Sequence, residues 1–167
     1  LAPMSYATPI NSPSISFIGL VERFMALPEK AKLTDKGKLE YRVTFRLLAE
    51  LFGESTPINA IARVDCRKAQ AVFMRLPANS TKRFPNCRVQ DIITKAEKQK
   101  IPPMAPKTAN SYLIRLSTLF KWAEEEGLIE SNPAKGLLLP ETEAQKDKRH
   151  PFTVAQLNSI FGSPVMC

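Results

Sequence analysis

Glycine, histidine and cysteine are all scarce in this 167-residue chain, which contains six, one and three of them, respectively. Six scattered glycines can scarcely build a glycine-rich phosphate loop. A catalytic triad or dyad usually needs a positioned histidine or paired carboxylates, and the single histidine, His150, lies in a charged stretch where solvation is expected. The consecutive Glu124, Glu125 and Glu126 point in different directions on a helix. We therefore expect this chain alone to be non-catalytic, with neither a metal nor a cofactor.

Long hydrophobic runs are also missing, so no segment is expected to span a bilayer. The sequence opens without a charged region before an apolar stretch, so no signal peptide is expected. Cys66, Cys87 and Cys167 are odd in number and lack metal-ligand spacing, which favours reduced thiols. We therefore expect a cytoplasmic protein with neither a membrane nor a small-molecule substrate as partner.

Positive charge is in excess, because 24 lysines and arginines face 16 aspartates and glutamates, for a net charge of +8. This excess favours an anionic partner such as nucleic acid, with solubility alone as the alternative. Hydrophobic residues make up 44% of the chain, which at this length suffices for the core of one domain.

Apolar residues recur with helical spacing over most of the chain, whereas strand signals and repeats are absent, so the fold is predicted to be all-α. Thr34 is expected to cap the second helix, with Leu39, Val43, Leu47 and Leu51 on its buried face. Gly53 is expected to end that helix, and Asp65 to cap the third. The predicted helical faces cover residues 17–24, 39–51, 69–76, 89–96 and 109–123. A turn and a short helix are expected around Pro133.

We divide the chain by composition into four parts. Residues 1–13 are an irregular lead-in, 14–139 a helical domain, 140–150 a basic linker, and 151–167 the first helix of a truncated second domain.

Short polar and basic side chains lie on the predicted helix 107–123, opposite its apolar stripe. Hydroxyl and amide groups flanked by cations suit a major groove, where base edges need donors and acceptors and phosphates need charge. A plain solvated face is the alternative. The candidate DNA-binding residues of this helix are Lys107, Thr108, Asn110, Ser111, Arg115, Thr118 and Lys121. A second candidate surface consists of Lys36, Lys38, Tyr41 and Arg42.

Three stretches of local sequence carry a family resemblance. They are residues 107–123, the segment from Gly127-Leu128-Ile129 through Asn132-Pro133-Ala134, and residues 148–153 with Gln156-Leu157 and Ile160-Phe161. In order and spacing they resemble the N-terminal core-binding (SAM-like) domain of the tyrosine recombinases, or phage-type integrases, and the start of their catalytic domain.

The resemblance implies an orthogonal bundle of four main helices plus short extra helices that clamps duplex DNA during DNA integration and recombination. Lys148 and Arg149 of the linker would pass beside phosphates. The implied setting is a mobile element on the bacterial or phage nucleoid, with other recombinase protomers as partners. The family cleaves and rejoins strands through a tyrosine nucleophile, but Tyr6, Tyr41 and Tyr112 lie upstream of its expected place. Residues 78–106 exceed the minimal four-helix plan.

Two other functions remain open from the sequence. A helical protein–protein interaction module would carry its positive charge incidentally and would tolerate salt, which a phosphate clamp would not. A helix-turn-helix regulator is a weaker alternative, because prolines 102, 103 and 106 precede the last long helix.

Overall fold

The computed structural model describes residues 14–140 together with Val154 and Ala155, and every regular element in these residues is a helix. The all-α prediction is confirmed. The elements are α1 (Phe17–Met25), α2 (Pro28–Ala31), α3 (Asp35–Phe52), the 3-10 turn η1 (Ile58–Ala60), α4 (Arg63–Phe73), α5 (Ser80–Arg83), α6 (Val89–Lys98) and α7 (Pro106–Glu125).

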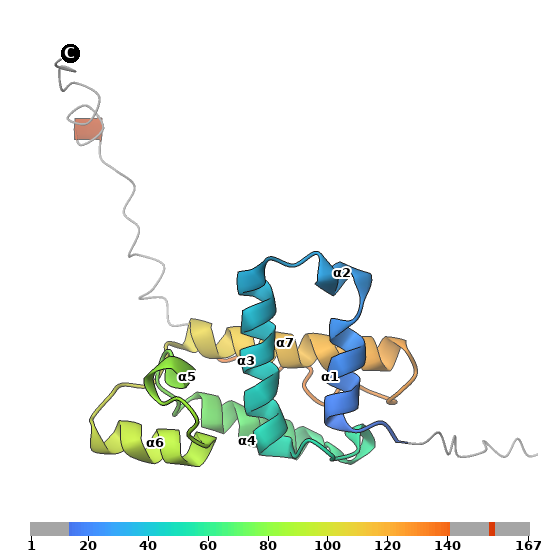
Figure 1. The fold of residues 1–167 in the computed structure, drawn as a ribbon, viewed down its shortest axis with the longest axis horizontal. Helices are drawn as coiled ribbons and strands as arrows, with labels where there is room; N and C mark the ends of the chain where they lie inside the picture. The colour runs from blue at the N-terminus through green and yellow to red at the C-terminus, as the bar shows by residue number, and fades with distance from the viewer. Residues whose placement is uncertain (1–13, 141–153, 156–167) are drawn as a thin grey trace, which may run out of the picture.

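The longest helix, α7, is the centre of the bundle and contacts α1, α3 and α4 (Figure 1). In the view of Figure 1, α1 and α3 both cross α7, and the N-terminal end of α3 projects beyond it on one side and its C-terminal part on the other. The shorter α5 and α6 lie together beside the lower end of α3, near the N-terminal end of α7. These contacts unite the four main helices and the added short ones in one bundle. None of the described helices is both long and apolar enough to cross a membrane.

Side chains and one glycine set the ends of α1 and α3. The Ser16 hydroxyl accepts a hydrogen bond from the Gly19 N–H at 3.2 Å, and Thr34 does the same for Gly37 at 3.1 Å. Gly53 ends α3 with φ +92°, and a Cβ there would lie 2.6 Å from the Thr56 hydroxyl oxygen. The predicted roles of Thr34 and Gly53 are confirmed.

The predicted cap of the third helix is wrong by one turn. The α4 helix begins at Arg63 with Ala62 as its N-cap residue. Asp65 lies inside the first turn, where its carboxylate accepts a hydrogen bond from the Ala62 N–H at 3.1 Å. Asp65 therefore supplies one half of a capping box, and Ala62 has no side-chain oxygen for the other half.

One continuous core joins all the main helices. Phe17, Leu20, Val21 and Phe24 of α1 are buried as predicted. The predicted face of α3 is partly wrong, because Leu39 is 54% exposed. Residues spaced by four wind around a helix by about 40° per step, so Leu39 cannot share a face with residues three turns later. The buried residues of α3 are Thr44, Phe45, Leu47, Leu48 and Ala49.

After α7 the chain turns at Gly127 and runs back along that helix to its N-terminal end, as the pale orange trace in Figure 1 shows. Residues 132–139, here named the strap, contain a turn at 133–136 rather than the short helix expected after Pro133. Side chains of α4 and α7 bind the strap backbone: Arg63 and Gln70 of α4 donate to the carbonyls of Lys135 and Leu137, both at 2.6 Å, and Asn110 of α7 donates to that of Leu139 at 2.9 Å. The strap is thereby fixed against α4 and α7.

Candidate nucleic-acid interface

The two predicted DNA-binding helices meet at Arg115. This side chain extends from α7 to α3, where one guanidinium nitrogen bonds the Glu40 carboxylate and another donates to the Thr44 hydroxyl at 3.4 Å. Its guanidinium carbon lies 5.6 Å from the centre of the Tyr41 ring. The side chain is only 17% exposed. The expectation that Arg115 lies free on the outer face is wrong, because the crossing of α3 over α7 covers it.

Asn110 is also turned inward. It is 5% exposed, and its amide makes hydrogen bonds to both the N–H and the carbonyl of Leu139 in the strap. The expectation that this amide is available to base edges is wrong in this fold. The sequence offers no local signal for the contact, because its partner lies 29 residues later.

Tyr41 belongs to an aromatic cluster instead of an open surface. Its ring packs against Phe24 and Phe45, with centroids 6.1 and 5.6 Å apart, and its hydroxyl accepts a hydrogen bond from Lys30 at 3.4 Å. Trp122 of α7 closes the same cluster, 5.7 Å from Phe24. Tyr41 is therefore a packing residue, and Trp122 fits the packing role that its place beside the apolar stripe suggests.

Tyr112 lies on the inner side of the same crossing. Its ring stacks on Phe73 of α4 with a centroid distance of 5.2 Å. Burial raises the pKa of its hydroxyl, the nearby Arg115 lowers it and the Glu40 carboxylate raises it. The phenol is therefore neutral at physiological pH and holds α4 and α7 together.

The remaining candidates on α7 stay at the surface. Lys107, Thr108 and Lys121 are exposed, and the Lys121 ammonium lies 3.7 Å from the Glu125 carboxylate. Ser111 and Thr118 are half-buried, and each donates its hydroxyl hydrogen bond to a backbone carbonyl one turn earlier, at 3.2 and 2.7 Å. Such bonds leave the oxygen lone pairs free but occupy the proton.

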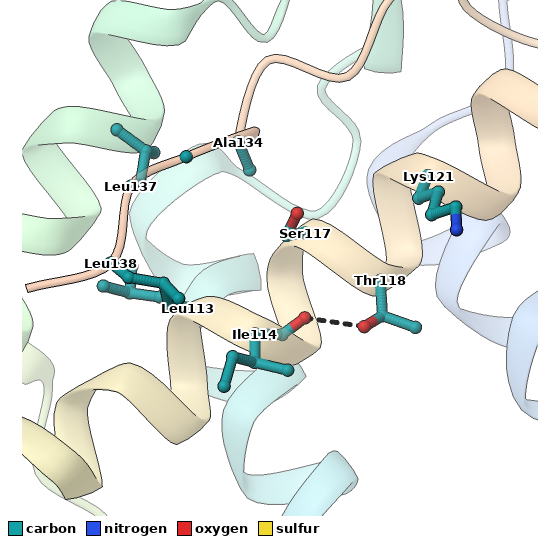
Figure 2. Close-up of a pocket in the computed structure, with 9 residues that line it drawn as sticks. Leu113, Ile114, Ser117, Thr118, Lys121, Ala134, Leu137 and Leu138 are labelled. Atoms are coloured by element: carbon teal, nitrogen blue, oxygen red, sulfur yellow. Dashed lines mark hydrogen bonds between the residues drawn. The ribbon is translucent and has the colours of Figure 1, made fainter.

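The middle of this α7 face is more apolar than expected. Figure 2 shows Ile114, Thr118 and Lys121 along one side of a groove between α7 and the strap, with Leu137 and Leu138 on the other. The groove has a volume of about 190 Å³, and Ile114 and Leu138 are 50% and 55% exposed. The cations of α7 therefore flank an apolar centre.

The α3 helix presents the better-defined basic surface. Lys38, Arg42 and Arg46 recur every four residues and so form one row, named here the α3 basic row, while Lys36 lies in the first turn. Arg42 and Arg46 are exposed and Lys38 is half-buried. Among the described residues, no carboxylate lies within ion-pair distance of these side chains. Arg46 was absent from the predicted set, although its spacing from Arg42 would have identified it.

Two carboxylates of α3 make hydrogen bonds to other parts of the fold. Glu40 pairs with Arg115, and Glu50 accepts a hydrogen bond from the Val89 N–H at 2.7 Å, at the start of α6. Asp35 lies in the first turn of α3, where the helix dipole favours a negative charge. As a result, Glu40 and Glu50 are exposed but hydrogen-bonded to other parts of the fold, while Arg42 and Arg46 are exposed without a carboxylate partner among the described residues.

The net charge resides entirely in the described body. Residues 14–140 hold 21 lysines and arginines against 13 aspartates and glutamates, a net of +8 that equals that of the whole chain. The predicted contacts Lys148 and Arg149, with the linker and the proposed final helix, lie outside the described residues. Within the described part, no cluster of histidine, cysteine, aspartate or glutamate is suited to holding a metal ion.

No protein-family model matches the chain, and no curated protein matches its sequence. A solved structure with a similar arrangement is that of the Tn1549 transposon integrase in complex with circular intermediate DNA. The TM-score is 0.48 at 16% sequence identity, and the match covers 89% of this chain and 39% of that one. The chain thus spans about two fifths of the length of that integrase chain.

Proposed function

We propose that this chain binds duplex DNA as the core-binding domain of a tyrosine recombinase, using the α3 basic row and the N-terminal end of α7. The observation that carries the proposal is the pairing of charge on α3: the exposed carboxylates of Glu40 and Glu50 hydrogen-bond Arg115 and the Val89 N–H, while Arg42 and Arg46 are exposed without a carboxylate partner among the described residues. Unpaired cations in a row suit the regularly spaced phosphates of a duplex.

The two ends of α7 differ in charge in a way that orients the DNA. Lys107 is exposed at its N-terminal end, whereas Glu124, Glu125 and Glu126 are exposed at its C-terminal end. Phosphates are attracted to the first end and repelled by the second. The duplex is therefore placed toward the N-terminal end of α7.

The proposal extends to the arrangement of the whole chain. Residues 14–139 form the DNA-binding domain, residues 140–150 a charged linker with three basic and three acidic residues, and residues 151–167 open the catalytic domain. Lys148 and Arg149 then add phosphate contacts. Other recombinase protomers on the same DNA are the proposed protein partners, and the bacterial or phage-derived protein works in the cytoplasm, on the nucleoid.

A salt titration of DNA binding tests this function. Fluorescence anisotropy with a duplex of about 25 base pairs should give an affinity whose logarithm falls linearly with the logarithm of the salt concentration. The double variant Arg42→Gln and Arg46→Gln should bind about tenfold more weakly at low salt, with a slope reduced by about 2, one unit per lost phosphate contact.

The matched control removes the same charge elsewhere. Arg67 on α4 and Lys135 in the strap are exposed, and neither forms an ion pair among the described residues. The variant Arg67→Gln with Lys135→Gln should keep nearly the wild-type slope. Equal losses in the two double variants would show a diffuse charge effect, and no binding at low salt would favour the protein-interaction alternative.

A further inference from the structure

A second concentration of positive charge lies in the part of the chain that exceeds the four-helix plan. Residues 80–100, here named the α5–α6 lobe, contain six basic residues and only Asp91 and Glu97 as acidic ones. Glu97 is bonded by Arg75 of the chain before the lobe at 2.6 Å. Asp91 is therefore the one acidic residue of the lobe itself without a basic partner from outside it, and Glu50 of α3 lies against the start of α6. The six basic residues are Lys82, Arg83, Arg88, Lys95, Lys98 and Lys100.

The lobe is built into the core as a fixed platform. Val89, Ile92, Ile93 and Ala96 of α6 are each at most 2% exposed and belong to the same core as the main helices. The Glu50 carboxylate of α3 accepts the first N–H of α6. Rigid attachment means that the lobe presents its charges in a defined position relative to α3.

Two cations of the lobe face one open hollow. Arg83 of α5 and Lys95 of α6 line it together with Gln99, and Phe84 and Ile101 complete the lining. The hollow has a volume of about 550 Å³ and no carboxylate in its wall. Its donors are a guanidinium, an ammonium and an amide, a set that suits the oxygens of phosphate groups.

The positions of these side chains are not explained by local stability. Cations in the last turn of α6 favour the helix dipole, which accounts for Lys95 and Lys98. Arg83 lies in the last turn of the four-residue α5, and the dipole of either helix does not explain why cations from two helices line the same hollow. Lys95 also has no carboxylate bonded to it and donates instead to the Cys87 sulfur, a weak acceptor, at 3.1 Å.

We propose that the α5–α6 lobe is a second phosphate-binding surface, at which Arg83 and Lys95 hold the backbone of the duplex that the α3 basic row binds. This inference rests on the proposed function, because its ligand is the same DNA. The lobe contacts α3 through α6, and in the view of Figure 1 it lies on the same side of the bundle as the N-terminal end of α7, the end that carries Lys107. The lobe thereby lengthens the bound stretch of DNA beyond the part covered by the main helices.

The test compares two lengths of duplex. With about 25 base pairs, Arg83→Gln with Lys95→Gln should weaken binding about tenfold and lower the salt slope by about 2. With about 10 base pairs, roughly one helical turn, the same variant should lose at most twofold, since the short duplex is held by the main helices. Arg67→Gln with Lys135→Gln is the matched control, and circular dichroism checks that each variant is folded.

A second measurement uses the unaltered chain. Acetylation of Lys95 and Lys98 by acetic anhydride, followed by mass spectrometry, should slow at least threefold when the long duplex is present, while that of Lys135 should not. Two results together would overturn the lobe site. The variant Arg83→Gln with Lys95→Gln would bind the long duplex as tightly as the control variant, and DNA would protect Lys95 and Lys98 from acetylation no more than Lys135. If the double variant Arg42→Gln with Arg46→Gln still bound duplex DNA more weakly than wild type, the proposed function would stand without the lobe site. Failure of the wild-type chain to bind any duplex would remove both proposals.

Discussion

The side-chain amide of Asn110 makes two hydrogen bonds to the backbone of Leu139, donating to its carbonyl at 2.9 Å and accepting from its N–H at 2.7 Å. This pairing joins the first third of α7 to the end of the strap. It therefore fixes the end of the strap close to the N-terminal end of α7, the end proposed to face the DNA.

Asn110→Ala should destabilise the fold through this contact. The substitution leaves the N–H and carbonyl of Leu139 without partners and should lower the free energy of unfolding by about 1–3 kcal/mol. Asn110→Asp should cost at least as much, because a carboxylate can accept from the N–H but faces the carbonyl oxygen. Urea unfolding measures both. Ser111→Ala is the control, expected within about 0.5 kcal/mol of wild type. Wild-type stability with weaker DNA binding in Asn110→Ala would instead assign the amide to DNA.

Arg115 and Glu40 should behave as one energetic unit. Arg115→Ala removes the bonds to Glu40 and Thr44 and should lower the free energy of unfolding by about 1–3 kcal/mol. A double-mutant cycle with Glu40→Ala should give a coupling energy of about 1 kcal/mol, because the pair is only partly screened by solvent. Thermal and urea unfolding of the four proteins provide the values.

The same variants separate a packing role of Arg115 from DNA contact. Well below the melting temperature, Arg115→Ala should change DNA affinity no more than Arg67→Ala does, because its guanidinium is held at the crossing of α3 and α7. A tenfold loss of affinity in a fully folded Arg115→Ala protein would restore the role expected from the sequence.

Completing the capping box of α4 should stabilise the protein. Ala62 has the extended backbone of an N-cap residue, with φ −95° and ψ 168°, and Asp65 already accepts its N–H. Ala62→Ser adds the missing oxygen for the N–H of the first turn and should raise the free energy of unfolding by about 0.5–1 kcal/mol. Ala60→Ser, in the preceding turn, should have no comparable effect. No gain in stability from Ala62→Ser would mean that water already satisfies the backbone N–H groups in the first turn of α4.

The sequence predicted the helices well, because a helix with one buried face has apolar residues at a helical period. That period can be recognised from residues that are close together in the chain. The buried stripe of α7 and the cap at Thr34 follow from neighbours within a few residues. The candidate site was predicted less well, because periodicity places Asn110 and Arg115 on a side of α7 without revealing what covers that side. The strap covers Asn110 and α3 covers Arg115, and both contacts join residues that are distant in sequence. Arg46 was missed because the predicted basic surface covered only the first half of α3, Lys36 to Arg42.

Cys66 should make the stability of the fold depend on pH in the alkaline range. Its side chain is fully buried on α4, and burial raises the pKa of the thiol to about 12 from an ordinary value of 9.0, with a further rise from the Asp65 carboxylate. Above about pH 9 the unfolded chain loses this proton while the folded chain keeps it. The folded state then binds more protons, so stability is complete below about pH 9 and is lost as pH rises toward 12.

The loss should approach about 1.4 kcal/mol per pH unit within that window. Urea unfolding of wild type and Cys66→Ala at about pH 8 and about pH 10 measures it, since other groups titrate equally in both proteins. Wild type should lose about 1 kcal/mol more than Cys66→Ala between the two values. Parallel pH profiles for wild type and Cys66→Ala would show that water reaches the Cys66 thiol in the folded state, and the core around α4 would then be open at this position.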